Sequence, residues 1–191
     1  LSLLKPVYRT MDELISAGLK VEEGFTMDPR PVDFKNVKCN LLDKILFSTV
    51  LYGKQKTYEE QLTALGLKSE NAFSCACYFD EMGNVPKKGD VLSWAESSAV
   101  NYANSVLGAR CNRNSGMIDI FGSIVGFVPK FGLLTDEGRK AKWKVIVKTE
   151  KKPLPQILGS AIGIKVMEDV PYIVGLDKWL GTELTDEVKA Y

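Results

Sequence analysis

The residues best suited to chemistry lie in the loop Gly-Ala-Arg110-Cys-Asn-Arg113-Asn-Ser-Gly116. The planar fork of arginine donates paired hydrogen bonds to a carboxylate or a phosphate. A single surface arginine would most simply form a salt bridge. Two arginines and several short polar residues between glycines fit anion binding at least as well, so both interpretations stay open.

The segment Ser93–Leu107, before this loop, is the clearest predicted helix. One face carries Ser97, Asn101, Asn104 and Ser105, whereas a solvated helix face is usually built from longer charged residues that form helices better. This face is interpreted either as a polar seam between helices or as a ligand contact. The pattern Ser-Trp-Ala-Glu96 predicts a capping box at the start of the helix, and capping alone explains Glu96.

The cysteine and histidine content limits the chemistry. There are four cysteines and no histidine, so this chain supplies neither a Ser-His-Asp triad nor a His-Glu-x-x-His zinc site. Cys75 and Cys77 lie near the end of a predicted strand, where α/β folds build sites. Two thiols are too few for a closed cluster site, so packing and metal ligation both remain open.

Composition excludes several classes of partner. The 191 residues carry a net charge of +1, which gives no electrostatic footprint for nucleic acid or an anionic membrane. No run of about 18 apolar residues predicts a transmembrane helix. Residues 1–10 do not resemble a signal peptide. We expect a cytoplasmic protein whose partners include neither nucleic acid nor membrane.

Hydrophobic periodicity and turn residues predict an α/β fold. Helices are predicted at residues 11–18, 40–52, 58–67, 93–107 and 117–125, with the start of another at 185–191, and strands at 20–25, 71–78 and 142–148. Residues 159–166 and 170–175 are either two strands or one helix and one strand. A proline-punctuated loop, residues 26–33, contains Asp28 and Pro29.

Several of these segments resemble one enzyme family. Cys75-Ala-Cys-Tyr78, Gly-Asn-Val-Pro86-Lys-Lys-Gly89 and the run from Trp94-Ala-Glu-Ser-Ser-Ala to Ala-Asn-Ser-Val-Leu-Gly-Ala-Arg-Cys-Asn-Arg113 are similar to the catalytic region of aconitase X. Phe25-Thr-Met-Asp-Pro29 and Gly126-Phe-Val-Pro-Lys-Phe-Gly132 resemble its flanking segments. The resemblance covers most of the chain and is strongest in its middle third.

The resemblance implies an aconitase-like layered α/β domain, of which residues 1–191 are a single partial fragment with a candidate small lobe at 135–191. Members of the family are hydro-lyases that dehydrate cis-3-hydroxy-L-proline or phosphomevalonate, with an iron–sulfur cluster or iron as Lewis acid. A small swivelling subunit or domain completes their site. By position, Cys75 would ligate iron, Glu96 and Ser97 would be catalytic, and the substrate would contact Asp28, Pro29, Asn104, Arg110 and Arg113.

The sequence departs from the family pattern at three positions. Asp28 replaces an asparagine, Ala76-Cys77 replaces Thr-Pro, and Leu134 replaces a histidine. The remaining cluster cysteines of the family lie outside this chain, so we expect the fragment alone to hold no stable cluster and to be inactive. The departures leave room for a non-catalytic ligand-binding or assembly homologue, and less readily for a thiol–metal structural domain.

Overall fold

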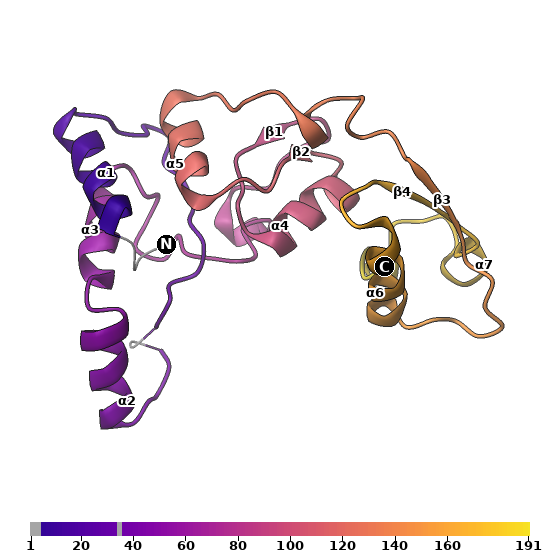
Figure 1. Ribbon diagram of the computed structural model, residues 1–191, viewed down its shortest axis with the longest axis horizontal. Coiled ribbons are helices and arrows are strands. Elements are labelled where there is room, and N and C mark those ends of the chain that lie inside the picture. The colour runs from indigo at the N-terminus through magenta and orange to yellow at the C-terminus, as the bar shows by residue number, and fades with distance from the viewer. Residues whose placement is uncertain (1–4, 34–35) are drawn as a thin grey trace. The chain divides into compact units, whose positions relative to one another are not determined.

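The computed structural model describes residues 5–33 and 36–191, which divide into two compact units between Pro129 and Lys130. Helices alternate with short parallel strand pairs, so the predicted α/β class is confirmed (Figure 1). The second unit begins five residues before the candidate lobe that the sequence analysis placed at 135–191. Among the described helices, none has the length and apolar character needed to cross a bilayer.

The first unit is built on the packing of α1 (Lys5–Ser16) against α3 (Gln55–Ala64). Apolar residues at helical spacing put one face of α1 into the core. The buried core residues are Val7, Tyr8, Met11, Phe25, Tyr58, Leu62, Leu65, Leu67, Ala72 and Ile120. Gln61 is buried with them, and its Nε2 donates to Tyr8 O at 3.0 Å, so this polar group joins the two helices.

Between these helices, α2 (Leu41–Ile45) continues into the π-helical turn η1 (Leu46–Leu51). This confirms the helix predicted at 40–52, but none of its side chains is buried. After α3 come the 3₁₀ turn η2 (Asp80–Met82) and β1 (Val91–Leu92). Strand β1 pairs in parallel with β2 (Arg110–Cys111), with Leu92 opposite Cys111.

The predicted helix 93–107 is shorter than expected and changes its winding. It consists of α4 (Ser97–Tyr102) followed by the π-helical turn η3 (Ala103–Leu107), and it ends at Gly108, which is left-handed at φ 67°. Ala99 and Ala103 are fully buried. The next helix, α5 (Gly116–Val125), ends at Gly126 as predicted, and Ser115 caps its start.

Two predicted strands in the first unit are wrong. Residues 20–25 contribute only the single bridge Phe25–Leu67, and residues 71–78 only the bridge Met27–Phe73. Both segments run beside the core with few ladder hydrogen bonds. Apolar residues of these two segments pack into the core, but the segments do not form a sheet.

The second unit contains a β–α–β arrangement. Strands β3 (Trp143–Ile146) and β4 (Pro171–Val174) pair in parallel, joined by α6 (Pro155–Val166), which settles the ambiguity at 159–175 as one helix and one strand (Figure 1). The 3₁₀ turn η4 (Gly132–Leu134) precedes them, and α7 (Asp177–Leu180) and α8 (Asp186–Lys189) follow. Thr185 caps α8, in agreement with the predicted helix start.

Candidate active site

A small cavity in the first unit joins segments that are distant in sequence. Its volume is about 30 Å³, and it is lined by Thr26, Met27, Asp28, Ser74, Cys77, Ser93, Trp94, Ala95, Glu96, Gly116 and Asp119. These residues come from the loop 26–33, the segment after Phe73, the start of α4 and the first turn of α5. Two predicted site residues, Asp28 and Glu96, therefore face one cavity although 68 positions separate them.

Glu96 is placed by the helix that follows it. It is the N-cap residue of α4, and its Oε1 accepts a hydrogen bond from Ser98 N at 3.2 Å. The hydroxyl of Ser97 also donates to this oxygen, at 3.2 Å. The predicted capping box is wrong in its register, because Glu96 itself is the cap and Ser93 lies outside the helix. Glu96 and Ser97, the two expected catalytic residues, are thus in direct contact.

Ser93 is instead held by a partner from another element. Its Oγ donates to the backbone oxygen of Asp119 at 3.2 Å and to Asp119 Oδ1 at 3.0 Å. Gly122 of α5 lies against this contact, since a Cβ on that residue would be 2.6 Å from Ser93 Oγ. The absence of a side chain at Gly122 lets the segment before Glu96 pack against α5.

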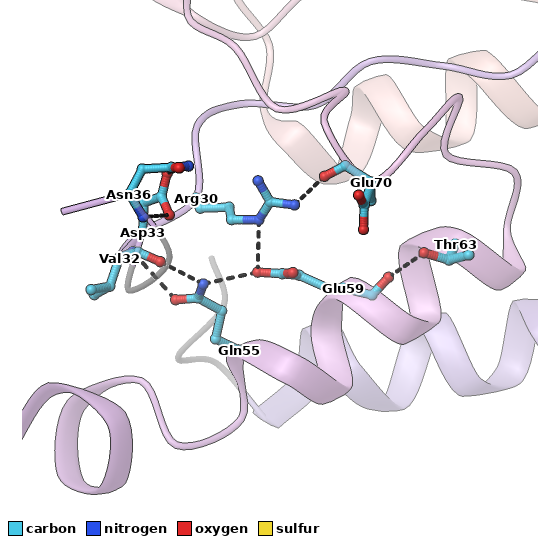
Figure 2. A network of polar contacts seen from close by, with 8 residues as sticks. All are labelled: Arg30, Val32, Asp33, Asn36, Gln55, Glu59, Thr63 and Glu70. Atoms are coloured by element: carbon cyan, nitrogen blue, oxygen red, sulfur yellow. Dashed lines mark hydrogen bonds and ion pairs between the residues drawn. The ribbon is translucent and has the colours of Figure 1, made fainter. Parts of the chain in front are cut away.

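The loop carrying Asp28 is held by a polar network that begins at Arg30 (Figure 2). Arg30 Nε lies 3.2 Å from Glu59 Oε1, the guanidinium donates to Glu70 O, and it stacks over the Phe73 ring at 4.2 Å. Gln55 exchanges hydrogen bonds with the backbone of Val32 and donates to Glu59 at 2.8 Å. Helix α3 thereby fixes the chain immediately after Asp28 and Pro29.

Burial governs the acidity of groups at the cavity. It raises the pKa of Asp28, and the nearby Glu96 raises it further. Burial raises the pKa of Asp119 to about 6; the hydrogen bond from Ser93 opposes this shift, and Asp28 adds to it. A neutral carboxyl is therefore favoured at both aspartates compared with an ordinary surface position.

The thiols fall into two classes. Cys39 and Cys75 are exposed, whereas Cys77 and Cys111 are buried. Burial raises the pKa of Cys77 to about 12 and that of Cys111 to about 11, so these two stay protonated. A thiol binds metal as the thiolate. The described residues contain no group of three His, Cys, Asp or Glu side chains placed to hold a metal ion.

Cys75, the residue expected to ligate iron, is one of the two exposed cysteines among the described residues. Cys75 is accessible, and its backbone oxygen accepts a hydrogen bond from Ser98 Oγ at 3.4 Å, which places it next to the start of α4. The buried thiol of Cys77 lines the cavity as a neutral group.

The remaining predicted residues do not line this cavity. Asn104 is engaged by the backbone: its Nδ2 donates to Val100 O at 2.9 Å and Cys111 O at 2.8 Å, and its Oδ1 accepts from Cys111 N. It therefore joins α4 to β2. Arg110 is half-buried in β2, while Arg113 and Pro29 are exposed.

Sequence reasoning missed Ser93 as an anchor and Asp119 entirely. Asp119 is the only charged residue in the otherwise apolar helix Gly-Met-Ile-Asp-Ile-Phe-Gly-Ser-Ile-Val. A single acid in such a helix costs stability unless it has a specific partner. That pattern was available in the sequence and could have marked Asp119 as a site residue.

The sequence of this chain matches one protein family and several characterised relatives. The family described as aconitase X first domain matches residues 5–137. The phosphomevalonate dehydratase large subunit of Thermococcus kodakarensis is 40% identical over 170 residues, which cover 86% of this chain and 38% of that protein. The cis-3-hydroxy-L-proline dehydratase of Hypocrea jecorina is 32% identical over 124 residues, covering 62% of this chain and 20% of that protein.

A solved structure extends the similarity to the fold. The crystal structure of Thermococcus kodakaraensis aconitase X in its holo-form superimposes with a TM-score of 0.68 at 32% identity, covering 88% of this chain and 40% of that one. The chain thus spans about two fifths of the length of this dehydratase large subunit and of this solved structure. The aconitase-like fold expected from the sequence is confirmed, and the chain belongs to the aconitase X family.

Proposed function

We propose that this chain supplies one fragment of the catalytic region of a hydro-lyase that removes water from a small hydroxy-carboxylate. The observation that carries the proposal is the meeting of Asp28 and Glu96 at one cavity, with the exposed Cys75 beside the same helix start. Relatives named as dehydratases support the reaction class. Phosphomevalonate and cis-3-hydroxy-L-proline are the two candidate substrates.

In this proposal the carboxyl groups of Asp28 and Glu96 carry out the proton transfers of the dehydration. Removal of water needs a base for the departing C–H proton and an acid for the leaving hydroxyl. Glu96 lines the cavity, and hydrogen bonds from Ser97 and Ser98 hold its Oε1 at the start of α4. An iron–sulfur cluster or iron, with Cys75 as this chain's ligand, would supply Lewis-acid assistance to the leaving hydroxyl.

The raised pKa of Asp28 suggests how an aspartate can stand where the family has an asparagine. A neutral carboxylic acid can donate a hydrogen bond as an amide does, without placing a full negative charge next to an anionic substrate. Burial and the neighbouring Glu96 both favour that neutral form. Pro29 follows in the same loop, and Arg110 and Arg113 are the candidate partners for a carboxylate or phosphate of the substrate.

The proposal is tested by anaerobic reconstitution of the whole large subunit with its small swivelling subunit, iron and sulfide. We expect bound iron and loss of water from one of the two candidate substrates. Glu96→Gln should lower kcat by at least about 100-fold, the usual contribution of a general acid or base. An assembly that takes up no iron and releases no product would instead favour the alternative, a non-catalytic ligand-binding or assembly homologue.

The choice of metal ligand is tested by a matched pair of variants. Cys75→Ser should reduce the iron content of the reconstituted assembly, whereas Cys77→Ser should retain it, because the buried thiol stays neutral. Iron and acid-labile sulfide are measured on each purified variant. Equal iron retention in both variants would contradict the assignment of Cys75.

A further inference from the structure

The cavity collects negative charge without a compensating positive group. Three carboxyl side chains line it: Asp28 from the loop, Glu96 from the start of α4 and Asp119 from α5. The described lining residues include no lysine, arginine or histidine. Three ionised carboxylates around so small a space repel one another in a poorly solvated environment. Uptake of a proton or a cation would relieve this repulsion.

Asp119 is the most strongly affected of the three. Its side chain is only 7% exposed, and its Oδ1 accepts the hydrogen bond from Ser93. Its Oδ2 is buried and has no hydrogen-bond partner among the described residues. A buried carboxylate oxygen without a partner is costly, whereas a protonated oxygen can donate to water. The free oxygen is therefore the natural position for a proton.

The groups facing Asp119 from the neighbouring elements reinforce this assignment. Burial and, to a lesser extent, the charge of Asp28 raise the pKa of Asp119, which in total reaches about 6. The thiols of Cys77 and Cys111 remain neutral because burial raises their pKa values. Glu96 acts on Asp28 in the same direction. The hydrogen bonds to Asp119 from Ser93 and Asn114 lower its pKa but only partly offset its burial.

We propose that Asp119 carries a proton on Oδ2 and exchanges it with Asp28 and Glu96 through water held in this cavity. A volume of about 30 Å³ is enough for one or two water molecules. In the exchange, Asp119 gives its proton to a water, which passes one of its own to a carboxylate of Asp28 or Glu96. Asp119 is left ionised, held by the Ser93 hydroxyl, and the total number of protons is unchanged.

The role of this exchange in catalysis rests on the proposed function. An acid that has protonated a leaving hydroxyl must regain a proton before the next turnover. Asp119 lines the same cavity as the two candidate acid–base groups and stores that proton there. It is a proton reserve and not a group that touches the substrate.

The test is infrared spectroscopy of the 191-residue chain as a function of pH. We expect the C=O stretching absorption of neutral carboxyls to persist above the range in which an ordinary aspartate ionises, and the contribution of Asp119 to this band to be lost in Asp119→Asn. Asp80→Asn, at an exposed aspartate, is the control and should keep the band. Asp28→Asn should keep it too, with its midpoint at lower pH, because one neighbouring charge is removed.

Two outcomes would overturn the proposal. One is a band that is missing in the wild type or unchanged in Asp119→Asn. The other is a divalent cation, added as Mg²⁺ or Mn²⁺, that binds the wild type at neutral pH but not Asp119→Asn, since a cation would then balance the charge. The infrared band does not depend on turnover or on iron. An inactive assembly with an intact band would therefore count against the dehydratase proposal alone.

Discussion

Two polar clusters in the first unit differ in whether their charged side chains have partners of opposite charge. In the network of Figure 2, Arg30 pairs with Glu59, and hydrogen bonds from Gln55 and to Glu70 O satisfy the neighbouring groups. At the cavity, Asp28, Glu96 and Asp119 meet without a positive partner among the lining residues. The paired charges of Arg30 and Glu59 hold a loop in place. At the cavity, the unpaired carboxyl groups instead help to raise the pKa values of Asp28 and Asp119. The second arrangement costs stability, which proteins tolerate at functional sites.

The comparison predicts opposite signs for the two clusters when an acid is replaced by its amide. Asp119→Asn should stabilise the protein by up to about 3 kcal/mol above pH 6, since one pKa unit corresponds to about 1.4 kcal/mol. The raised folded pKa means that wild-type stability falls as pH rises from about 4 to 6. Urea unfolding at several pH values measures this, and a variant with the wild-type pH dependence would contradict the prediction.

Glu59→Gln should have the opposite effect. It leaves the Arg30 guanidinium without its ion pair in a position where both side chains are less than a third exposed, and we expect a loss of about 1–2 kcal/mol. The matched control is Glu13→Gln, which breaks the exposed pair with Arg9 and should cost under about 0.5 kcal/mol. Equal losses in the two variants would show that the Arg30 network contributes nothing specific.

Gly122→Ala should have the smallest net effect on stability and a specific effect on the cavity. The new methyl group meets Ser93 Oγ and Val128 Cγ1, and the strain of about 1–3 kcal/mol exceeds the gain of about 1 kcal/mol in helix propensity. Gly159→Ala, in helix α6 with open space around its Cβ, should be stabilising. Thermal unfolding of the pair checks the difference in sign.

The Gly122→Ala variant should also change the pKa of Asp119. Displacing the Ser93 hydroxyl removes the hydrogen bond that lowers the pKa of Asp119. The infrared midpoint of Asp119 should therefore move to higher pH in Gly122→Ala and stay unchanged in Gly159→Ala. An unchanged midpoint in both variants would mean that Ser93 does not control this carboxyl.

Local signals in the sequence predicted many elements correctly. Left-handed glycines at 108 and 126 end helices where expected, and the alternation at residues 142–148 predicted β3. These features depend on a few neighbouring residues, so a short window contains the necessary information. The strands predicted at 20–25 and 71–78 failed because strand formation needs a partner, and each segment finds only one bridging residue.

The candidate site was predictable only in part. The family resemblance brought Asp28, Glu96 and Cys75 together as expected site residues, and the structure places the first two at one cavity. It gave no indication of Asp119 or of the role of Ser93. The capping box at Ser93 failed because the hydroxyl binds Asp119, 26 residues away, in preference to the nearest backbone amides.

By itself, the sequence determined the family, the α/β class, the helix ends at Gly108 and Gly126 and the absence of histidine chemistry from this chain, because residue identity and short-range spacing decide those properties. Only the tertiary structure decided which polar groups are buried together. Asp28, Glu96 and Asp119 come from three separate segments, and the fold brings their carboxyl groups together at one cavity. Their pKa values depend on desolvation and on neighbours distant in sequence, and both arise only when the chain is folded.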